Sequence, residues 1–191
     1  MNFHVMPGLP DTDGIRITRE KDISSIKEMF DNPDYVPDML KIYPTMVMPG
    51  TALMKQYKQG VYKPLTTPEA AEIIAEAHRF IPEYCRVMRV QRDIPTFATE
   101  AGVDKTNLRQ YVEKIAKERS IEFRDIRSRE IGALDVDETP EIKIREYDAS
   151  SGKEFFISAE FLKSDKILGF VRLRFPPRSL HPVITLRSAL I

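Results

Sequence analysis

Apolar and amphipathic segments alternate along residues 1–120. Each short apolar run predicts a buried strand, and these runs lie at 3–6, 39–43 and 85–90. Each stretch with apolar residues at helical spacing predicts a helix, and these stretches lie at 23–30, 51–60 and 67–80 and after Asp104. The N-caps expected for these helices are Asp22, Thr51, Thr66 and Asp104. Strands that alternate with helices pair in parallel through right-handed crossovers. We therefore predict an α/β fold that amounts to about half of a (β/α)₈ barrel, which takes roughly 250 residues.

The pattern changes after Leu134, where the acidic segment 135–140 indicates a linker. Three strand candidates follow, at 141–147, 154–162 and 167–175, and a fourth is expected to begin near Val183. The turns between them are short and polar, which is typical of an antiparallel meander. We divide the chain into two parts, 1–134 and 135–191, and expect the first to be truncated at its start and the second at its end.

Two of the predicted strands end in polar side chains. The second strand ends in Lys41 and Tyr43, and the third is followed by Gln91, Arg92 and Asp93. In α/β folds, ligand-handling residues lie at the carboxyl ends of strands, so these five residues are candidates for a binding site. The alternative is that they are ordinary solvated strand ends, with Arg92 and Asp93 in a structural pairing network.

Charge balances over the whole chain, with 29 basic and 29 acidic residues, so net charge alone indicates no polyanionic partner. Two segments are nonetheless basic, and the first contains Arg124, Arg127 and Arg129. Guanidinium groups bind phosphates in a bidentate manner, which favours a nucleic-acid contact. The alternative is ion pairing with nearby carboxylates or with the neighbouring domain. The second segment contains Arg172 and Arg174, which alternate with apolar residues and are expected on the exposed face of a strand.

The single cysteine, Cys85, excludes an internal disulfide and cannot by itself supply the ligands of an iron–sulfur cluster or a structural zinc site. His78 and His181 have no metal-ligand partner at useful spacing, and no metal site is predicted. His4, just before the first loop, has either a structural or a functional role. The sequence has no signal peptide and no apolar run of transmembrane length, which favours a cytoplasmic protein.

Six motifs resemble the family of the Elongator catalytic subunit, a radical-SAM and acetyltransferase protein that modifies wobble uridine in tRNA. They occur in family order at 4–10, 38–45, 89–95, 107–109, 124–132 and 168–174. The resemblance implies the C-terminal part of a radical-SAM (β/α) barrel, followed by the antiparallel strands that open a GNAT-type acetyltransferase domain. In this family, S-adenosylmethionine cleaved at a 4Fe–4S cluster yields a radical that activates acetyl-CoA, and a carboxymethyl-type product forms on the uridine.

The resemblance also implies roles for the candidate residues. Those expected to bind cofactor or substrate are His4, Lys41, Tyr43, Gln91, Arg92 and Asp93, and those expected to contact tRNA are Arg124, Arg127 and Arg129. The family's cluster cysteines lie before the segment that begins at His4, and its glycine-rich acetyl-CoA loop lies beyond Ile191. We therefore expect no cofactor in this chain and no activity from the chain alone, whereas the longer enzyme would use S-adenosylmethionine, the 4Fe–4S cluster and acetyl-CoA.

Two functions follow from these expectations. The first is a part of a tRNA wobble-uridine modifying enzyme, and the alternative is a non-catalytic fragment that binds tRNA or docks onto a partner. The partners to test are tRNA, the remaining parts of the same enzyme and a second copy of the chain. No membrane partner is expected.

Overall fold

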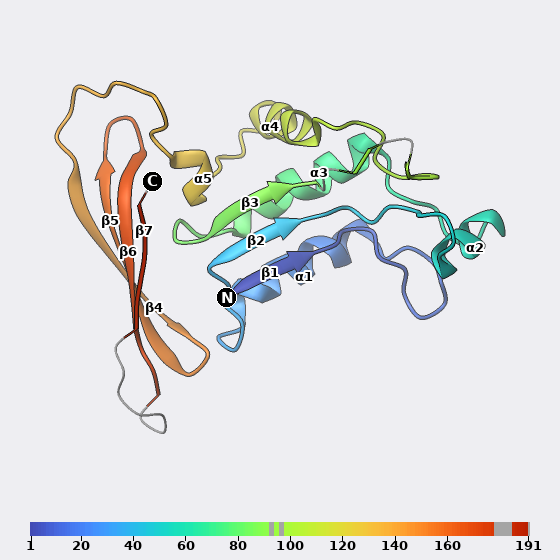
Figure 1. Cartoon of the computed structure of the whole chain (residues 1–191), viewed down its shortest axis with the longest axis horizontal. Helices are drawn as coiled ribbons and strands as arrows, with labels where there is room; N and C mark the ends of the chain where they lie inside the picture. The colour runs from blue at the N-terminus through green and yellow to red at the C-terminus, as the bar shows by residue number, and fades with distance from the viewer. Residues whose placement is uncertain (92–93, 96–97, 178–184, 191) are drawn as a thin grey trace.

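The computed structural model describes residues 1–91, 94–95, 98–177 and, for the backbone, 185–190. It contains a three-stranded parallel sheet and a four-stranded antiparallel sheet (Figure 1). The predicted α/β fold with a following antiparallel meander is therefore confirmed. Within the described residues, no helix is both long enough and apolar enough to cross a membrane.

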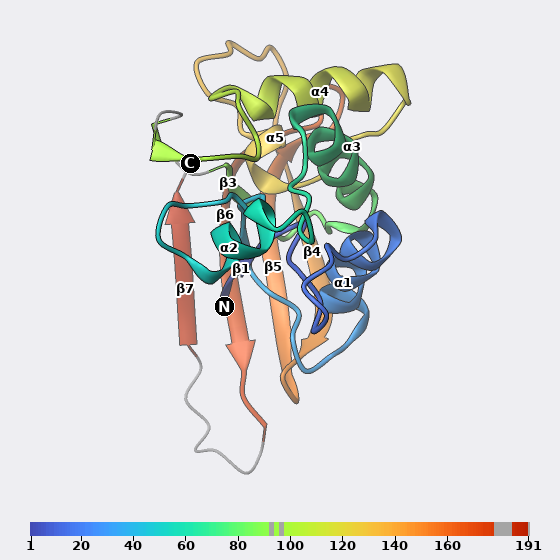
Figure 2. The ribbon, with the colours of Figure 1, turned by 90° about the vertical axis from the view of Figure 1, so that its right-hand side faces the viewer.

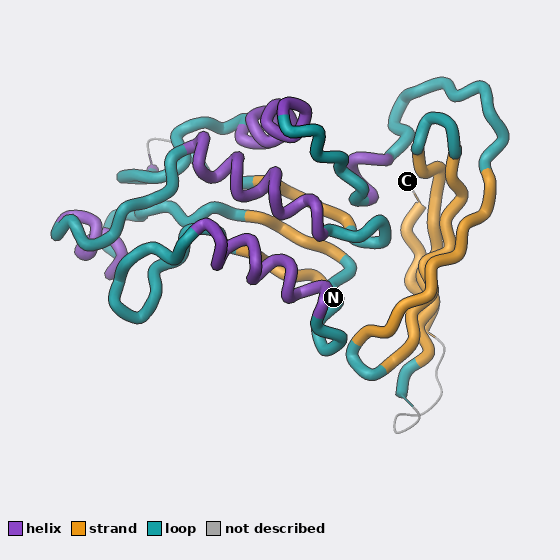
Figure 3. Tube along the Cα trace, turned by 180° about the vertical axis from the view of Figure 1, so that it is seen from behind, coloured by secondary structure: helices purple, strands orange, loops and turns teal. Residues whose placement is uncertain are grey.

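The parallel sheet has the strand order β1-β2-β3, with β1 at Asn2–Val5, β2 at Met39–Ile42 and β3 at Arg86–Val90. Two helices, α1 (Arg19–Asp31) and α3 (Thr67–Ala77), cover one face of this sheet, as Figure 3 shows from behind. The remaining helical elements are α2 (Ala52–Lys58), the 3-10 turn η1 (His78–Phe80), α4 (Leu108–Glu118) and α5 (Ile126–Arg129).

The main apolar core lies between the parallel sheet and these two helices, and α4 adds Leu108 and Val112 to it. Leu40, Ile42 and Val87 are fully buried there, in one cluster with Ile26 of α1 and Ile74 of α3. Each such side chain contributes about 1.5–3 kcal/mol relative to an exposed one, so this layer fixes the strands in place. In the described part of the chain, no helix covers the opposite face of the sheet (Figure 1).

Two helix starts differ from the prediction. The N-cap of α1 is Thr18, so Asp22 lies inside the first turn and not at the cap. Helix α4 begins only at Leu108, and Asp104 instead accepts a 2.6 Å hydrogen bond from the hydroxyl of Thr67. Aspartate often caps helices, but each of these two aspartates accepts a hydrogen bond from a distant segment instead.

The antiparallel sheet follows sequence order, with β4 at Glu141–Ala149, β5 at Gly152–Phe161, β6 at Lys166–Phe175 and β7 at Thr185–Leu190. The first three strands lie where the sequence pattern predicts them, and the fourth begins close to the predicted position. The buried side chains Phe156 and Ile167 form a small core with Ile126 of α5.

The prediction that Arg172 lies on a solvated face is wrong. Arg172 and Arg174 do share a face of β6, but Arg172 is only 4% exposed. Arg172 forms an ion pair with Asp38 and donates to the carbonyl of Tyr84. Alternation along a strand indicates which side chains share a face, but not which face another part of the chain covers.

The polar face of the antiparallel sheet is thus the inner one. On it, Arg174 pairs with the buried Glu154 at 2.6 Å. The other face is apolar and more open, and Ile142 and Ile144 on β4 are 66% and 64% exposed.

The antiparallel sheet lies against the amino ends of the parallel strands. Seen from the carboxyl ends, it stands behind them (Figure 2). Arg172 of β6 pairs with Asp38, just before β2, and the rings of Tyr84 and Tyr147 stack at 3.9 Å. The carboxyl ends of β1, β2 and β3 consequently point away from this sheet.

Candidate functional site

Three basic side chains form a row across the parallel sheet. His4 of β1 is opposite Lys41 of β2, which in turn is opposite Arg89 of β3. The register shifts here, because Leu40 pairs with Val87 while the next residue of β2 skips one residue of β3. An irregularity of this kind re-aims a side chain. It brings Arg89 into the same row as Lys41.

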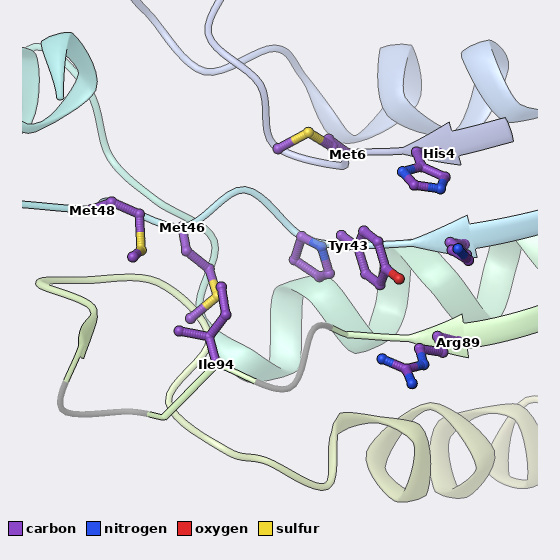
Figure 4. Close-up of a pocket in the computed structure, with 9 residues that line it drawn as sticks. His4, Met6, Tyr43, Met46, Met48, Arg89 and Ile94 are labelled. Atoms are coloured by element: carbon purple, nitrogen blue, oxygen red, sulfur yellow. The ribbon is translucent and has the colours of Figure 1, made fainter.

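The row of His4, Lys41 and Arg89 forms part of a pocket of about 550 Å³ at the carboxyl ends of the strands (Figure 4). We call it the strand-end pocket. The other lining residues are mainly thioether and ring side chains: Met6, Tyr43, Pro44, Met46, Met48 and Ile94. The rings of His4 and Tyr43 meet edge to face, with 5.6 Å between their centroids. Methionine side chains adapt to ligands of irregular shape, and a tyrosine offers a hydroxyl and a stacking face. The volume lies in the range of small-molecule sites.

The pocket is basic. None of its described lining residues is acidic, and Lys41 forms no ion pair with any described residue. A half-buried ammonium without a counter-ion attracts a carboxylate or a phosphate. The arrangement can therefore bind a planar ring next to an anionic group. The predicted candidates His4, Lys41 and Tyr43 meet in this one pocket, and Arg89 joins them through a register shift that the sequence pattern does not reveal.

Gln91 does not line this pocket. Its side chain is buried, and its Oε1 accepts from the backbone N–H of Leu108 at the start of α4, at 3.4 Å. Its backbone adopts a φ of 99°, which is uncommon for a residue with a side chain and constrains the chain at the end of β3. These contacts connect β3 to α4. The ligand-binding role of Gln91 stays a prediction, and Arg92 and Asp93 lie outside the described residues.

Two of the three arginines predicted to contact tRNA are engaged in ion pairs. Arg124 pairs with Glu83 and, at 3.2 Å, with Asp165. Arg129 is 2% exposed and pairs with Glu160 at 2.6 Å. These contacts match the alternative that the arginines form ion pairs. One partner, Glu160, belongs to β5 of the antiparallel sheet. The tRNA contact of Arg124 and Arg129 stays a prediction.

Arg127, the third of these arginines, is exposed. It donates a 2.7 Å hydrogen bond from its guanidinium to the carbonyl of Met88 on β3. No described carboxylate pairs with its side chain. It is therefore the member of the group best placed to meet a phosphate.

Glu160 is the buried carboxylate at the centre of the ion-pair network. Burial alone would raise its pKa, but hydrogen bonds from Arg145, Ser158 and Arg129 lower the pKa to about 2. This carboxylate is consequently charged over the whole physiological range. The network joins α5 to the antiparallel sheet.

Two side chains hydrogen-bond the backbone of Gly8 in the loop after β1. The carboxylate of Asp22 accepts from the Gly8 N–H at 3.0 and 3.1 Å, and the hydroxyl of Tyr62 donates to the Gly8 carbonyl at 2.6 Å. Burial raises the pKa of Asp22 to about 6. Gly8 has a φ of 80°, and a Cβ here would lie 2.7 Å from Leu65 Cδ1. These hydrogen bonds hold the loop that carries Met6 beside the pocket.

Neither Cys85 nor His78 belongs to the pocket. Cys85 is fully buried, and burial raises the pKa of its thiol. His78 is buried too, with Nδ1 2.7 Å from the carbonyl of Ile74 and its ring stacked on Phe123. A 4Fe–4S cluster needs several thiolates, so one buried thiol does not fit it. Among the described residues, no three His, Cys, Asp or Glu side chains gather as a metal site.

Comparison with known proteins matches the chain to one family. A family model described as the radical SAM C-terminal domain matches residues 37–118. The tRNA uridine(34) acetyltransferase of Methanocaldococcus jannaschii is 39% identical over 198 residues, which cover 100% of this chain and 36% of that protein. Elongator complex protein 3 of Saccharomyces cerevisiae is 39% identical over 176 residues, which cover 90% of this chain and 31% of that protein.

A solved structure supports the same relationship. The archaeal Methanocaldococcus infernus Elp3 with an N-terminal deletion matches 99% of this chain and 46% of its own chain, with a TM-score of 0.88 and 36% sequence identity. The chain spans 36% of the length of the first archaeal relative and 31% of the yeast relative. The resemblance seen in the six motifs is thereby confirmed. The chain is homologous to a segment of the proteins in the family that includes the tRNA uridine(34) acetyltransferases and Elongator complex protein 3.

Proposed function

We propose that this chain is part of an enzyme that modifies the wobble uridine of tRNA, and that the strand-end pocket receives the nucleoside. The observation that carries the assignment is the row of His4, Lys41 and Arg89 beside Tyr43 and the methionines, at the carboxyl ends of parallel strands. Relatives named tRNA uridine(34) acetyltransferase support the choice of substrate. In barrel enzymes, this end of the strands carries the chemistry.

In this proposal the chain binds and orients the nucleoside. The Tyr43 ring offers a stacking face for the base, and the thioethers of Met46 and Met48 close around it. Lys41 and Arg89 attract the negative charge of the nucleotide.

The cofactors belong to the same proposal for the longer enzyme. S-adenosylmethionine with a 4Fe–4S cluster would supply a radical, and acetyl-CoA would supply the carbon for a carboxymethyl-type product. Cys85 alone does not supply the thiolates that the cluster needs. The division into a barrel part, 1–134, and an acetyltransferase part, 135–191, and a cytoplasmic location are likewise proposed.

An affinity measurement tests the role of the pocket. We would compare binding of the chain to anticodon stem-loop RNAs that carry uridine or cytidine at the wobble position, by fluorescence anisotropy. We expect a preference for uridine, and we expect Lys41→Met to weaken binding about tenfold, as for loss of a charge-assisted contact. Lys114→Met is the matched control, because Lys114 is 75% exposed on α4. Equal affinity for both RNAs, with no effect of Lys41→Met, would refute the proposal.

The second candidate function is a non-catalytic tRNA-binding or docking fragment. The single thiol, which is buried, favours it for the chain taken alone. Anaerobic incubation of the purified chain with iron and sulfide tests this second candidate. A stoichiometric cluster absorbance in the purified chain would count against the non-catalytic reading.

A further inference from the structure

A second hollow lies beside β3, next to the strand-end pocket. It measures about 360 Å³ and is lined by Met88, Arg89, Val90, Gln91, Arg109 and Arg127. Three of these residues are arginines, and they come from three elements: β3, the first turn of α4, and α5. None of the described lining residues is acidic.

Arg127 is held at the rim of this hollow by its backbone and by its side chain. The buried carboxylate of Asp125 accepts from the backbone N–H of Arg127 and from that of Val87 on β3, both at 3.1 Å. The same carboxylate accepts from the hydroxyl of Ser128 at 2.5 Å. These bonds fix α5 against β3. The guanidinium of Arg127 then reaches the carbonyl of Met88 with one nitrogen, and its charge is not neutralised by any described carboxylate.

Arg109 is positioned from the opposite side. Its Nε pairs with Glu113 at 2.8 Å, and its Nη2 donates to the hydroxyl of Ser128 at 3.4 Å. Its Nη1 is buried and has no hydrogen-bond partner among the described residues. A buried donor without an acceptor is costly, and such groups point to a missing ligand or water. Glu113 is half exposed and pairs with the Nε of Arg109, so the buried Nη1 still has no acceptor among the described residues.

The two hollows share Arg89, which lines both of them. A nucleoside in the first would therefore have its phosphate side within reach of the second. We infer that the hollow formed by Arg89, Arg109 and Arg127 seats a phosphate group of RNA that flanks the nucleoside in the strand-end pocket. The inference rests on the proposed function for the identity of the nucleoside. It adds a phosphate site that includes Arg109, a residue not expected from the sequence to bind a ligand.

The salt dependence of RNA binding tests this site. Each phosphate contact to single-stranded RNA contributes about 0.7 to the slope of log affinity against log salt concentration. We expect Arg127→Gln to reduce the slope for the anticodon stem-loop by about 0.7, and Arg109→Gln to give a similar loss. Arg79→Gln is the control, because Arg79 is an exposed helical arginine paired with Glu76. Arg127 is exposed, so thermal unfolding of its variant should match that of the unaltered chain.

Competition with small ligands separates the sources of the phosphate. Uridine 5′-monophosphate should displace the RNA at lower concentration than uridine, and this advantage should disappear in Arg127→Gln. Inorganic phosphate that competes as well as uridine 5′-monophosphate would overturn the inference, since the site would then bind free anions. A salt slope unchanged in both variants would overturn it too. A reduced slope without any preference for wobble uridine would sustain the phosphate site and refute the proposed function.

Discussion

Among single residues, the buried carboxylate of Glu160 is the centre of an ion-pair network. Glu160 receives hydrogen bonds from Arg129 at 2.6 Å and from Arg145 at 2.6 and 3.2 Å. A buried charge that loses its partner destabilises a protein by roughly 3–5 kcal/mol. Arg145 would remain in place, so we expect Arg129→Ala to lower the free energy of unfolding by about 3 kcal/mol in urea titrations. Arg79→Ala, at an exposed ion pair, should change it by less than about 1 kcal/mol.

The same carboxylate predicts a pH dependence. The pKa of Glu160 is lowered from 4.5 to about 2, so its ionisation stabilises the folded state above pH 4.5. This contribution is lost as the pH falls through about 2. The stability advantage of the unaltered chain over Glu160→Gln should therefore be constant at neutral pH and shrink below pH 4.5. An advantage that grows on acidification would contradict the role given to this residue.

Only part of this residue-scale arrangement can be predicted from the sequence. The motifs single out Lys41 and Tyr43, and both line the pocket. Arg89 begins the motif at 89–95, but its place in the row cannot be predicted, because that place depends on a skipped residue in the pairing of β2 with β3. The motifs also cannot distinguish Arg127 from Arg129, since the burial of Arg129 depends on where the antiparallel sheet packs.

At the scale of elements, the loop after β1 depends on two distant side chains. Asp22 and Tyr62 hold the N–H and the carbonyl of Gly8. The pattern of an aspartate ahead of an apolar stripe predicts a helix cap, but the chain already has Thr18 in that position. The carboxylate is thus available for a contact that only the tertiary structure creates.

The pKa of Asp22 is shifted in the opposite direction to the pKa of Glu160. The Asp22 pKa is raised from 3.8 to about 6 by burial, so the folded state favours the protonated form. Its ionisation therefore lowers stability as the pH rises from about 4 to 6. In thermal unfolding, Asp22→Asn should gain stability relative to the unaltered chain across this window. A relative loss over the same window would contradict the buried, protonatable state of Asp22.

At the scale of the whole molecule, the two ends of the parallel sheet have separate tasks. The amino ends pack on the polar face of the antiparallel sheet through Arg172 and Asp38, whereas the carboxyl ends form the pocket. The alternation of strand and helix patterns predicts the parallel sheet, and the strand candidates joined by short polar turns predict the antiparallel one. The sequence pattern does not show how the two sheets face each other, because their docking depends on ion pairs between residues far apart in sequence.

This placement leaves the apolar face of the antiparallel sheet open at β4. Ile142 and Ile144 are 66% and 64% exposed, so they contribute little to the core. We expect Ile142→Thr combined with Ile144→Thr to change the free energy of unfolding by less than about 1 kcal/mol. Phe156→Ala, at a fully buried position of the same sheet, should cost about 3–5 kcal/mol. Similar losses for the two changes in urea titrations would mean that the open face is covered.

In the proposed function, the strand-end pocket receives the wobble nucleoside of tRNA. Photocross-linking tests it most directly, with 4-thiouridine placed at the wobble position of an anticodon stem-loop and the cross-linked peptides identified by mass spectrometry. We expect cross-links within residues 41–48, which carry Lys41, Tyr43, Met46 and Met48 of the pocket wall. A stem-loop with 4-thiouridine in its stem should not yield them. Cross-links confined to β4–β6, or equal yields from both RNAs at 41–48, would contradict this placement of the nucleoside.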